Sequence, residues 1–196
     1  AMIVEGELAP ATHVEEVKLS QQIGASRTPV REALIALEAE GLVRSQPRKG
    51  FVVVQPDEAL MRESFPILSA LEAMAVRMSG AGLKAAVPQL RRLNEALARE
   101  RKKARQYDLD RAFHIALTEH CGNARLLMLL NAERRRAQLI DGAHKKGMAN
   151  LEGSVKEHEA LIVAVERGSY SEAAALLTAH WDHGTEVVAQ WLREKP

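Results

Sequence analysis

The fold of this chain is decided by residues 24–43, which read GASRTPVREALIALEAEGLV. Gly24 is suited to end a helix, because glycine tolerates the left-handed backbone that a C-terminal turn needs. Ser26 or Thr28 is suited to cap the next helix, and Pro29 is tolerated in its first turn. The apolar residues of that second helix recur at helical spacing and predict a buried stripe of Val30, Ala33, Leu34 and Leu37.

A first helix is predicted just upstream of this turn, from about His13 to Ile23. Thr12 and Glu15 match the spacing of a capping box at its start, and Leu19 and Ile23 are expected to face inward. The connection to the second helix is too short for anything but a sharp turn. The two helices must therefore cross steeply, as they do in a helix-turn-helix.

The amino end of the second helix carries chemistry suited to DNA. Arg27 and Arg31 lie one helical turn apart, away from the centre of the buried stripe, and Thr28 lies beside them. Guanidinium groups, a hydroxyl and free backbone N–H groups at an exposed helix end can dock on a phosphate backbone and reach base edges. The alternative is a surface-charged helix in a generic bundle. It is disfavoured because the turn, cap, helix and strand signals agree along one stretch.

After this helix the pattern changes from helical to β-prone. Residues 42–44 and 51–54 are rich in β-forming side chains, and the basic sequence QPRKG lies between them at 46–50. This pattern predicts a two-stranded hairpin with a basic tip. A helix-turn-helix followed by such a hairpin is a winged helix. Lys49 and Gly50 are expected to reach the neighbouring groove or backbone, Gly50 because it allows a close backbone approach.

Beyond the linker at 55–57 the sequence predicts only helices. Their expected spans are 57–79 with a bend at Pro66, 85 or 88 to 105, 108–120, 123–141, 154–167 and 169–193, with a mobile loop at 144–153. The predicted fold is therefore mainly α. It consists of an N-terminal winged helix-turn-helix with a small β-hairpin (residues 1–56), followed by an all-α antiparallel helical bundle (residues 57–196).

The composition supports this class. Of the 196 residues, 46% are hydrophobic and only 4% are aromatic, which favours packed helices over a β-sandwich. The single cysteine, Cys121, excludes internal disulfides and suits a reducing compartment. Neither a membrane-spanning run nor a signal peptide is found, so we expect a soluble, cytoplasmic protein without membrane partners. The net charge of +1 gives no indication about nucleic acid.

Four polar residues on apolar stripes predict a metal site. Asp110 and His114 lie one helical turn apart, and His158 and His180 fall on the core-facing stripes of two later helices. Burying a lone carboxylate costs several kcal/mol unless it is paired or metal-bound. Convergence of the four groups on a divalent cation removes that cost and suits Zn²⁺, Ni²⁺ or Mn²⁺, with Zn²⁺ the first choice. The alternative is that each histidine is an ordinary core residue with a hydrogen-bond partner.

Other polar residues of the helical region receive simpler interpretations. His183 lies on the same side of its helix as His180 and is expected at the polar rim. Cys121 is expected to be a small core residue. The run Arg134-Arg135-Arg136 is expected on a solvated face, although one of the three could turn inward to meet an anionic ligand.

Residues 24–34 (GASRTPVREAL), together with EGLV at 40–43 and RKG at 48–50, resemble the GntR family of bacterial transcription regulators. The remainder resembles the FadR-like subfamily, in which a helical, metal-containing FCD domain senses a ligand. The residues that carry this second resemblance are Leu71, Glu72, Ala75, Asp110, Phe113, His114, Gly122, Asn123, Glu157, His158, Leu161 and His180.

The resemblance implies a homodimer that binds a palindromic operator, with residues 57–196 as the domain for effector binding and dimerisation. We expect the effector to be a small carboxylate. The DNA contacts that it implies by position are made by Arg27, Thr28 and Arg31 in the recognition helix, Ser26 at its start, and Lys49 and Gly50 in the wing.

The chain departs from the family's pattern in three places. Most of the first helix of the DNA domain is missing from this sequence. Val17 stands where some relatives carry an arginine that touches DNA. Leu68 stands where many carry an arginine that can bind a ligand carboxylate, which argues against an acidic effector held at that position.

The function that we expect is a ligand-responsive bacterial transcription regulator, a repressor by the family's more frequent habit, and not an enzyme. One alternative is a metal-dependent hydrolase that uses the Asp/His₃ centre to activate water. Against it, Glu157 is expected to point away from His158, and we identify no well-placed second carboxylate as a general base. A third possibility is a pure metal sensor, in which the ion itself is the effector.

Overall fold

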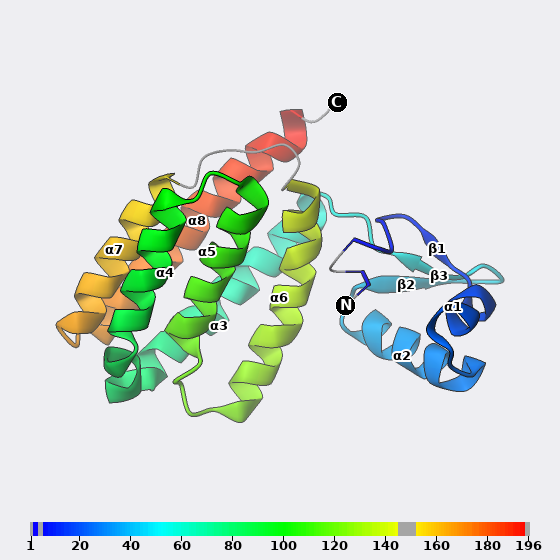
Figure 1. Ribbon diagram of the computed structural model, residues 1–196, viewed down its shortest axis with the longest axis horizontal. Coiled ribbons are helices and arrows are strands. Elements are labelled where there is room, and N and C mark those ends of the chain that lie inside the picture. Colours follow the sequence, from blue (N-terminus) through cyan, green and yellow to red (C-terminus); the bar gives the residue numbers. More distant parts are fainter. Residues whose placement is uncertain (1, 4–5, 145–151, 195–196) are drawn as a thin grey trace.

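The structure, a computed structural model, describes residues 2–3, 6–144 and 152–194. A small part with a sheet and two short helices lies at one end of the molecule, and long helices form the other part (Figure 1). The small part consists of β1 His13–Val14, α1 Glu16–Ile23, α2 Arg27–Ala39, β2 Val43–Gln46 and β3 Gly50–Val53. The sheet is antiparallel with the order β1-β3-β2, which confirms the winged helix-turn-helix and adds a strand that the sequence did not predict.

The start of the first helix is a correction. Residues His13 and Val14 form β1 and pair with β3, and Val14 is buried, so α1 begins only at Glu16. The predicted capping box does not form, since Glu15 is the N-cap and makes no side-chain cap hydrogen bond. The backbone explains the change, because the carbonyl of Thr12 accepts a hydrogen bond from the Val53 amide at 3.0 Å and the chain remains extended.

The helix-turn-helix itself follows the prediction closely. Gly24 ends α1 in the left-handed conformation, with φ 69°. Ser26 is the N-cap of α2 by backbone position, although its hydroxyl makes no cap hydrogen bond. Val30 and Leu34 are buried, whereas the predicted inward residues Ala33 and Ile23 are exposed. The buried stripe of α2 is therefore narrower than predicted.

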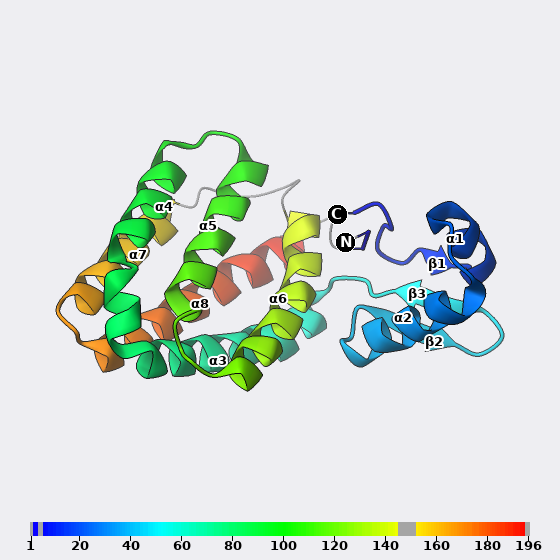
Figure 2. The same cartoon turned by 60° about the horizontal axis from the view of Figure 1, so that its bottom comes forward.

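The helical part follows the linker. Its helices are α3 Glu58–Ala85, α4 Val87–Arg99, α5 Lys103–Thr118, α6 Ala124–His144, α7 Glu152–Glu166 and α8 Tyr170–Glu194. Helix α3 crosses the bundle behind α5 in Figure 1 and lies along its lower side in Figure 2, and α8 and α6 pack against it. Most of the predicted loop at 144–153 lies outside the described residues.

Helix α3 is longer than predicted and is interrupted elsewhere. The Asp57 carboxylate caps it by accepting a hydrogen bond from the Leu60 amide at 2.8 Å. The non-helical residue within the span is Gly80 (φ 49°, ψ −133°), and the predicted bend was at Pro66. The last turn beyond Gly80 buries Leu83, which extends the element past the predicted end at residue 79.

A turn at Glu100 separates α4 from α5, whereas the predicted break between these two helices lay at residues 106–107. Glu100 has extended backbone (φ −71°, ψ 139°). Its carboxylate accepts hydrogen bonds from the backbone amides of Arg101 and Lys102, each at 2.8 Å. These bonds stabilise the turn locally, so residues 100–102 connect two helices and do not continue the first one.

The core forms two clusters that meet at α3. One extends from the winged part into the helical part and includes Val30, Leu34, Leu60, Leu68 and Ile140. The other lies among α3, α4, α5, α7 and α8 and includes Val76, Leu90, Phe113, Leu161 and Leu177. A group of buried polar side chains lies where these helices converge.

Candidate metal centre and DNA-binding surface

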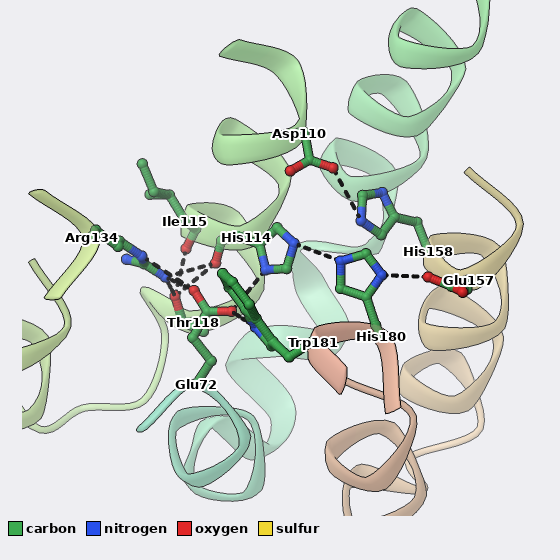
Figure 3. Close-up of polar contacts among 10 residues, drawn as sticks. All are labelled: Glu72, Asp110, His114, Ile115, Thr118, Arg134, Glu157, His158, His180 and Trp181. Carbon is green, nitrogen blue, oxygen red and sulfur yellow. Dashed lines mark hydrogen bonds and ion pairs between the residues drawn. The ribbon is translucent and has the colours of Figure 1, made fainter. Parts of the chain in front are cut away.

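Three histidines from three helices converge inside the helical part (Figure 3). His114 comes from α5, His158 from α7 and His180 from α8, and one ring nitrogen of each lies within 4.8 Å of the others. Asp110, one turn before His114, places Oδ1 3.6 Å from Nε2 of His158. The four residues predicted as ligands therefore lie together in space.

The distance between His114 and His180 fits a shared ion. Their Nε2 atoms lie 3.2 Å apart. Two nitrogens bound at about 2.1 Å to one ion lie about 3.0 Å apart in octahedral geometry and about 3.4 Å apart in tetrahedral geometry. The observed separation falls between these two values.

Carboxylates on the far side of two rings orient them for this role. Glu72 Oε2 lies 2.7 Å from Nδ1 of His114, and Glu157 Oε2 lies 2.6 Å from Nδ1 of His180. A carboxylate accepts a hydrogen bond from Nδ1–H, which leaves the lone pair of a neutral ring on Nε2. Both Nε2 atoms are then acceptors that face each other, an arrangement that a cation between them satisfies.

His158 and Asp110 contain buried polar atoms that lie 3.6 Å apart but make no hydrogen bond. Neither ring nitrogen of His158, nor Oδ1 of Asp110, has a hydrogen-bond partner among the described residues. His158 is fully buried and stacks on Phe113, with ring centroids 3.8 Å apart. Because buried polar groups in proteins are nearly always satisfied, these orphaned atoms indicate that the residues present fit a metal ion.

The pKa values of the buried groups shift in different directions. Burial, together with the charges of His114 and His180, holds the pKa of His158 well below its usual value, so this ring is neutral. Burial raises the pKa of Asp110 despite the opposing charges of His114 and His180. Burial would lower the pKa of His114, but Glu72 and Asp110 outweigh it and raise that pKa. A cation beside Asp110 would remove the cost of its buried charge.

Glu72 belongs to the site, although the spacing of polar residues on apolar stripes did not predict it there. It is fully buried on α3 and accepts hydrogen bonds from Trp181 Nε1 at 2.9 Å and Arg134 Nη2 at 2.7 Å, besides holding His114. Burial would raise its pKa, but the charges and hydrogen bonds of His114 and Arg134 lower it to about 2. The signal for Glu72 was present, because a glutamate between the buried residues Leu68 and Val76 requires a partner.

Other predicted neighbours lie at the edge of the site or outside it. Glu157, which was expected to point away from His158, contacts α8, where its two oxygens hold His180 and the exposed His183. Cys121 is buried in the core, and His120 lies at the molecular surface beside Gly82. Of the three consecutive arginines expected on a solvated face, Arg134 is buried and turns inward to Glu72.

The predicted DNA-contacting residues lie at the end of the winged part that is remote from the helical part. The amino end of α2 and the turn between β2 and β3 are both at that end (Figures 1 and 2). The side chains of Arg27 and Arg31 are 67% and 65% exposed. Glu16 of α1 lies 3.9 Å from Arg27 Nη2 and 3.6 Å from Arg31 Nη1, and it holds both guanidinium groups over the start of α2.

The wing has a tight basic turn. Lys49 is exposed, and its amide donates to the Gln46 carbonyl at 3.0 Å. Gly50 has φ +78°, and a Cβ there would lie 3.3 Å from the carbonyl oxygen of Val14. Glycine at this position therefore allows β1 to pair closely with β3, a role that needs no DNA.

Sequence comparisons agree with this architecture. Residues 1–53 match the profile of the bacterial regulatory proteins of the GntR family, and residues 63–183 match the FCD domain. A probable D-xylose utilization operon transcriptional repressor from Paenarthrobacter nicotinovorans is 30% identical over 181 residues, which cover 91% of this chain and 80% of the relative. An uncharacterized HTH-type transcriptional regulator from Streptomyces ambofaciens is 30% identical over 186 residues, covering 91% and 77% respectively.

A solved structure supports the same conclusion. A GntR-family transcriptional regulator from Pseudomonas syringae pv. tomato aligns with a TM-score of 0.58 and 28% identity, covering 98% of this chain and 81% of that chain. The fold and these matches define a bacterial transcription regulator. The chain belongs to the GntR family, in the group whose regulators carry an FCD domain.

The relatives and structural neighbours are transcription regulators rather than enzymes. In the part of the chain that the structure describes, none of the helices combines the length and the apolar character that crossing a membrane requires.

Proposed function

We propose that this chain is a ligand-responsive regulator with its DNA-binding domain in residues 1–56 and its effector domain in residues 57–196. The observation that carries the proposal is the joint exposure of the α2 amino end and the basic wing turn at one end of the winged part. The residues that would contact operator DNA are Ser26, Arg27, Thr28, Arg31, Lys49 and Gly50.

The helical domain would hold a divalent metal, with Zn²⁺ as the first choice. His114, His158, His180 and Asp110 are the ligands that we propose, and the orphaned atoms of His158 support the assignment. When bound, the ion would supply open coordination positions for a small chelating effector, a carboxylate in our proposal. The residues around it orient the imidazoles through Glu72 and Glu157.

Homodimerisation on a palindromic operator completes the proposal. Two winged helices would enter successive major grooves about 34 Å apart. Exposed apolar side chains on the helical domain support a subunit interface, namely Ile67, Met74 and Met78 on α3 and Met128 and Leu129 on α6. We place the dimer in the cytoplasm and assign it the role of a repressor.

A hydrolase built on the same centre is the weaker proposal. Such an enzyme needs a free carboxylate to act as general base beside the ion. The Glu72 carboxylate is already hydrogen-bonded to His114, Arg134 and Trp181. The Glu157 carboxylate is hydrogen-bonded to His180 and His183. A pure metal sensor differs from our proposal only in the effector, and it predicts DNA affinity that follows free metal with no organic ligand present.

The test is a titration of the chain on fluorescent fragments of the DNA upstream of its own gene, at two salt concentrations and against a scrambled fragment. We expect sequence-selective binding that weakens as salt rises, because phosphate contacts release counterions. Absence of selective binding, combined with metal-dependent turnover of a substrate, would overturn the proposal.

A further inference from the structure

Three consecutive arginines on α6 connect the metal centre to the winged part. Arg134, Arg135 and Arg136 point in different directions, because successive helical residues are rotated by about 100°. Arg134 contacts Glu72 at the centre, and Arg135 contacts Glu40, the C-cap residue of α2. Arg136 contacts Glu63 on α3 and lies beside Gly41. The sequence pattern alone indicated a solvated charge run.

The first arginine is fixed at the centre. Arg134 is 9% exposed and donates two hydrogen bonds to Oε1 of Glu72, at 2.7 Å from Nη2 and 3.2 Å from Nε. Its Nη2 also lies 3.0 Å from the carbonyl oxygen of His114 and 2.6 Å from Oγ1 of Thr118. Because Glu72 in turn holds Nδ1 of His114, any shift of that ring is opposed through Arg134.

The second arginine reaches the recognition helix. Nε of Arg135 donates to Oε2 of Glu40 at 2.7 Å, with the two side chains 40% and 30% exposed. Glu40 is the C-cap residue of α2, so this ion pair joins the carboxyl end of the recognition helix to α6. The exposed amino end of the same helix carries the proposed DNA contacts.

The third arginine, Arg136, packs beside Gly41, just after α2. A Cβ at Gly41, which has φ +72°, would lie 3.0 Å from Nε of Arg136. The guanidinium group of Arg136 therefore packs against the backbone just after α2, and its Nη2 lies 3.3 Å from Oε2 of Glu63 on α3. Arg136 is only 20% exposed, which makes it part of the contact between the two parts of the molecule.

From these contacts we propose that the Arg134–Arg136 segment couples occupancy of the metal centre to the placement of the recognition helix, with Arg135 and Arg136 as positioning residues. The inference rests on the proposed metal site. An ion held by His114 would restrain that ring, and His114 is tied to Arg134 through Glu72. Arg135 and Arg136 follow Arg134 on the same helix, so a restraint on Arg134 would extend to Glu40 and Gly41 through these two residues.

The test is hydrogen–deuterium exchange of the whole chain, compared between chelator-treated and Zn²⁺-saturated samples. In the wild-type chain we expect Zn²⁺ to change the exchange of amides in residues 37–43. Arg135→Gln and Glu40→Gln should each remove that change while leaving the zinc content the same. The charge-exchanged pair, Arg135→Glu with Glu40→Arg, should restore it, which a merely structural loss would not do.

The matched control is Arg125→Gln, an exposed arginine on the same helix, which should keep the zinc-dependent change. A wild-type chain that binds zinc without altered exchange at residues 37–43 would overturn the coupling but not the metal site, as would an unaltered response in Arg135→Gln. A wild-type chain that binds no zinc by elemental analysis would overturn both. DNA titration remains an independent measure of the proposed function.

Discussion

His114 and His180 direct their Nε2 atoms toward each other at 3.2 Å, while each Nδ1 is held by a different buried or half-buried glutamate. Two imidazoles oriented in this way cannot hydrogen-bond to each other when both are neutral, because each presents a lone pair. The glutamates therefore fix the two rings for a shared ligand before that ligand binds.

The first prediction concerns metal content. His158→Ala should remove the metal from the protein. His158 is fully buried, neither of its ring nitrogens has a hydrogen-bond partner among the described residues, and its Nε2 lies 3.6 Å from Asp110. Elemental analysis of the purified chain is the measurement. His158→Gln, which keeps more of the packing against Phe113, guards against simple unfolding. His120→Ala at the surface is the control, and an unchanged metal content in both His158 variants would remove His158 from the site.

Acid stability should depend on Glu72. Its folded-state pKa of about 2 lies below the ordinary value of 4.5, so its ionised form stabilises the fold above pH 4.5. That contribution is lost as the pH falls from 4.5 toward 2. Glu72→Gln should therefore lower the free energy of unfolding near neutral pH, by about 3–5 kcal/mol for a broken buried pair, and flatten its decline in acid.

Urea unfolding of chelator-treated protein across this pH range measures the Glu72 effect. The exposed Glu95, changed to Gln, is the control and should leave the profile nearly unaltered. Parallel pH profiles for wild type and Glu72→Gln would show that the buried ion pair with Arg134 does not contribute as we argue.

Sequence-specific DNA affinity should depend on Arg31. Arg31→Ala is expected to weaken specific DNA binding by about 1–3 kcal/mol if its guanidinium group contacts a base edge. Fluorescence titrations on the specific and scrambled fragments provide the measurement, with Lys84→Ala on the helical part as a control that should bind normally. An equal loss on both fragments would mean that Arg31 contacts only phosphate.

Glu16 is expected to sharpen DNA selectivity without contacting DNA. Its carboxylate lies within 4 Å of both Arg27 and Arg31 and is only 14% exposed, so it restricts two long, mobile side chains. Glu16→Gln should reduce the ratio of specific to scrambled affinity while non-specific affinity stays equal or rises, because one negative charge near the phosphates is removed. The exposed Glu15→Gln serves as the neighbouring control. A preserved ratio would show that the arginines are positioned without Glu16.

Local signals predicted the winged helix well. Gly24, Pro29 and the apolar spacing of Val30 and Leu34 act within a few residues of one another, so their meaning does not depend on the rest of the fold. Strand β1 was missed, because two residues give no periodicity and His13–Val14 extends only through its pairing with β3. The same limit placed the start of α1 too early.

In the helical part, the sequence identified the residues that face inward but not the pairs they form. Asp110, His114, His158 and His180 could be selected because each is polar on an apolar stripe. The partners of the set could not be assigned, since Glu72 lies 42 positions from His114 in the chain and meets it only after folding. The three arginines of α6 show the same limit, because charge alone does not reveal that each contacts a different element.

The central claim is that one divalent ion binds between His114, His158, His180 and Asp110. The most direct measurement is anomalous diffraction at the zinc absorption edge from crystals of the chain grown with Zn²⁺. We predict a peak at about 2.0–2.2 Å from the Nε2 atoms of His114 and His180, a nitrogen of His158 and a carboxylate oxygen of Asp110. A zinc-soaked crystal without anomalous density among these four residues would contradict it.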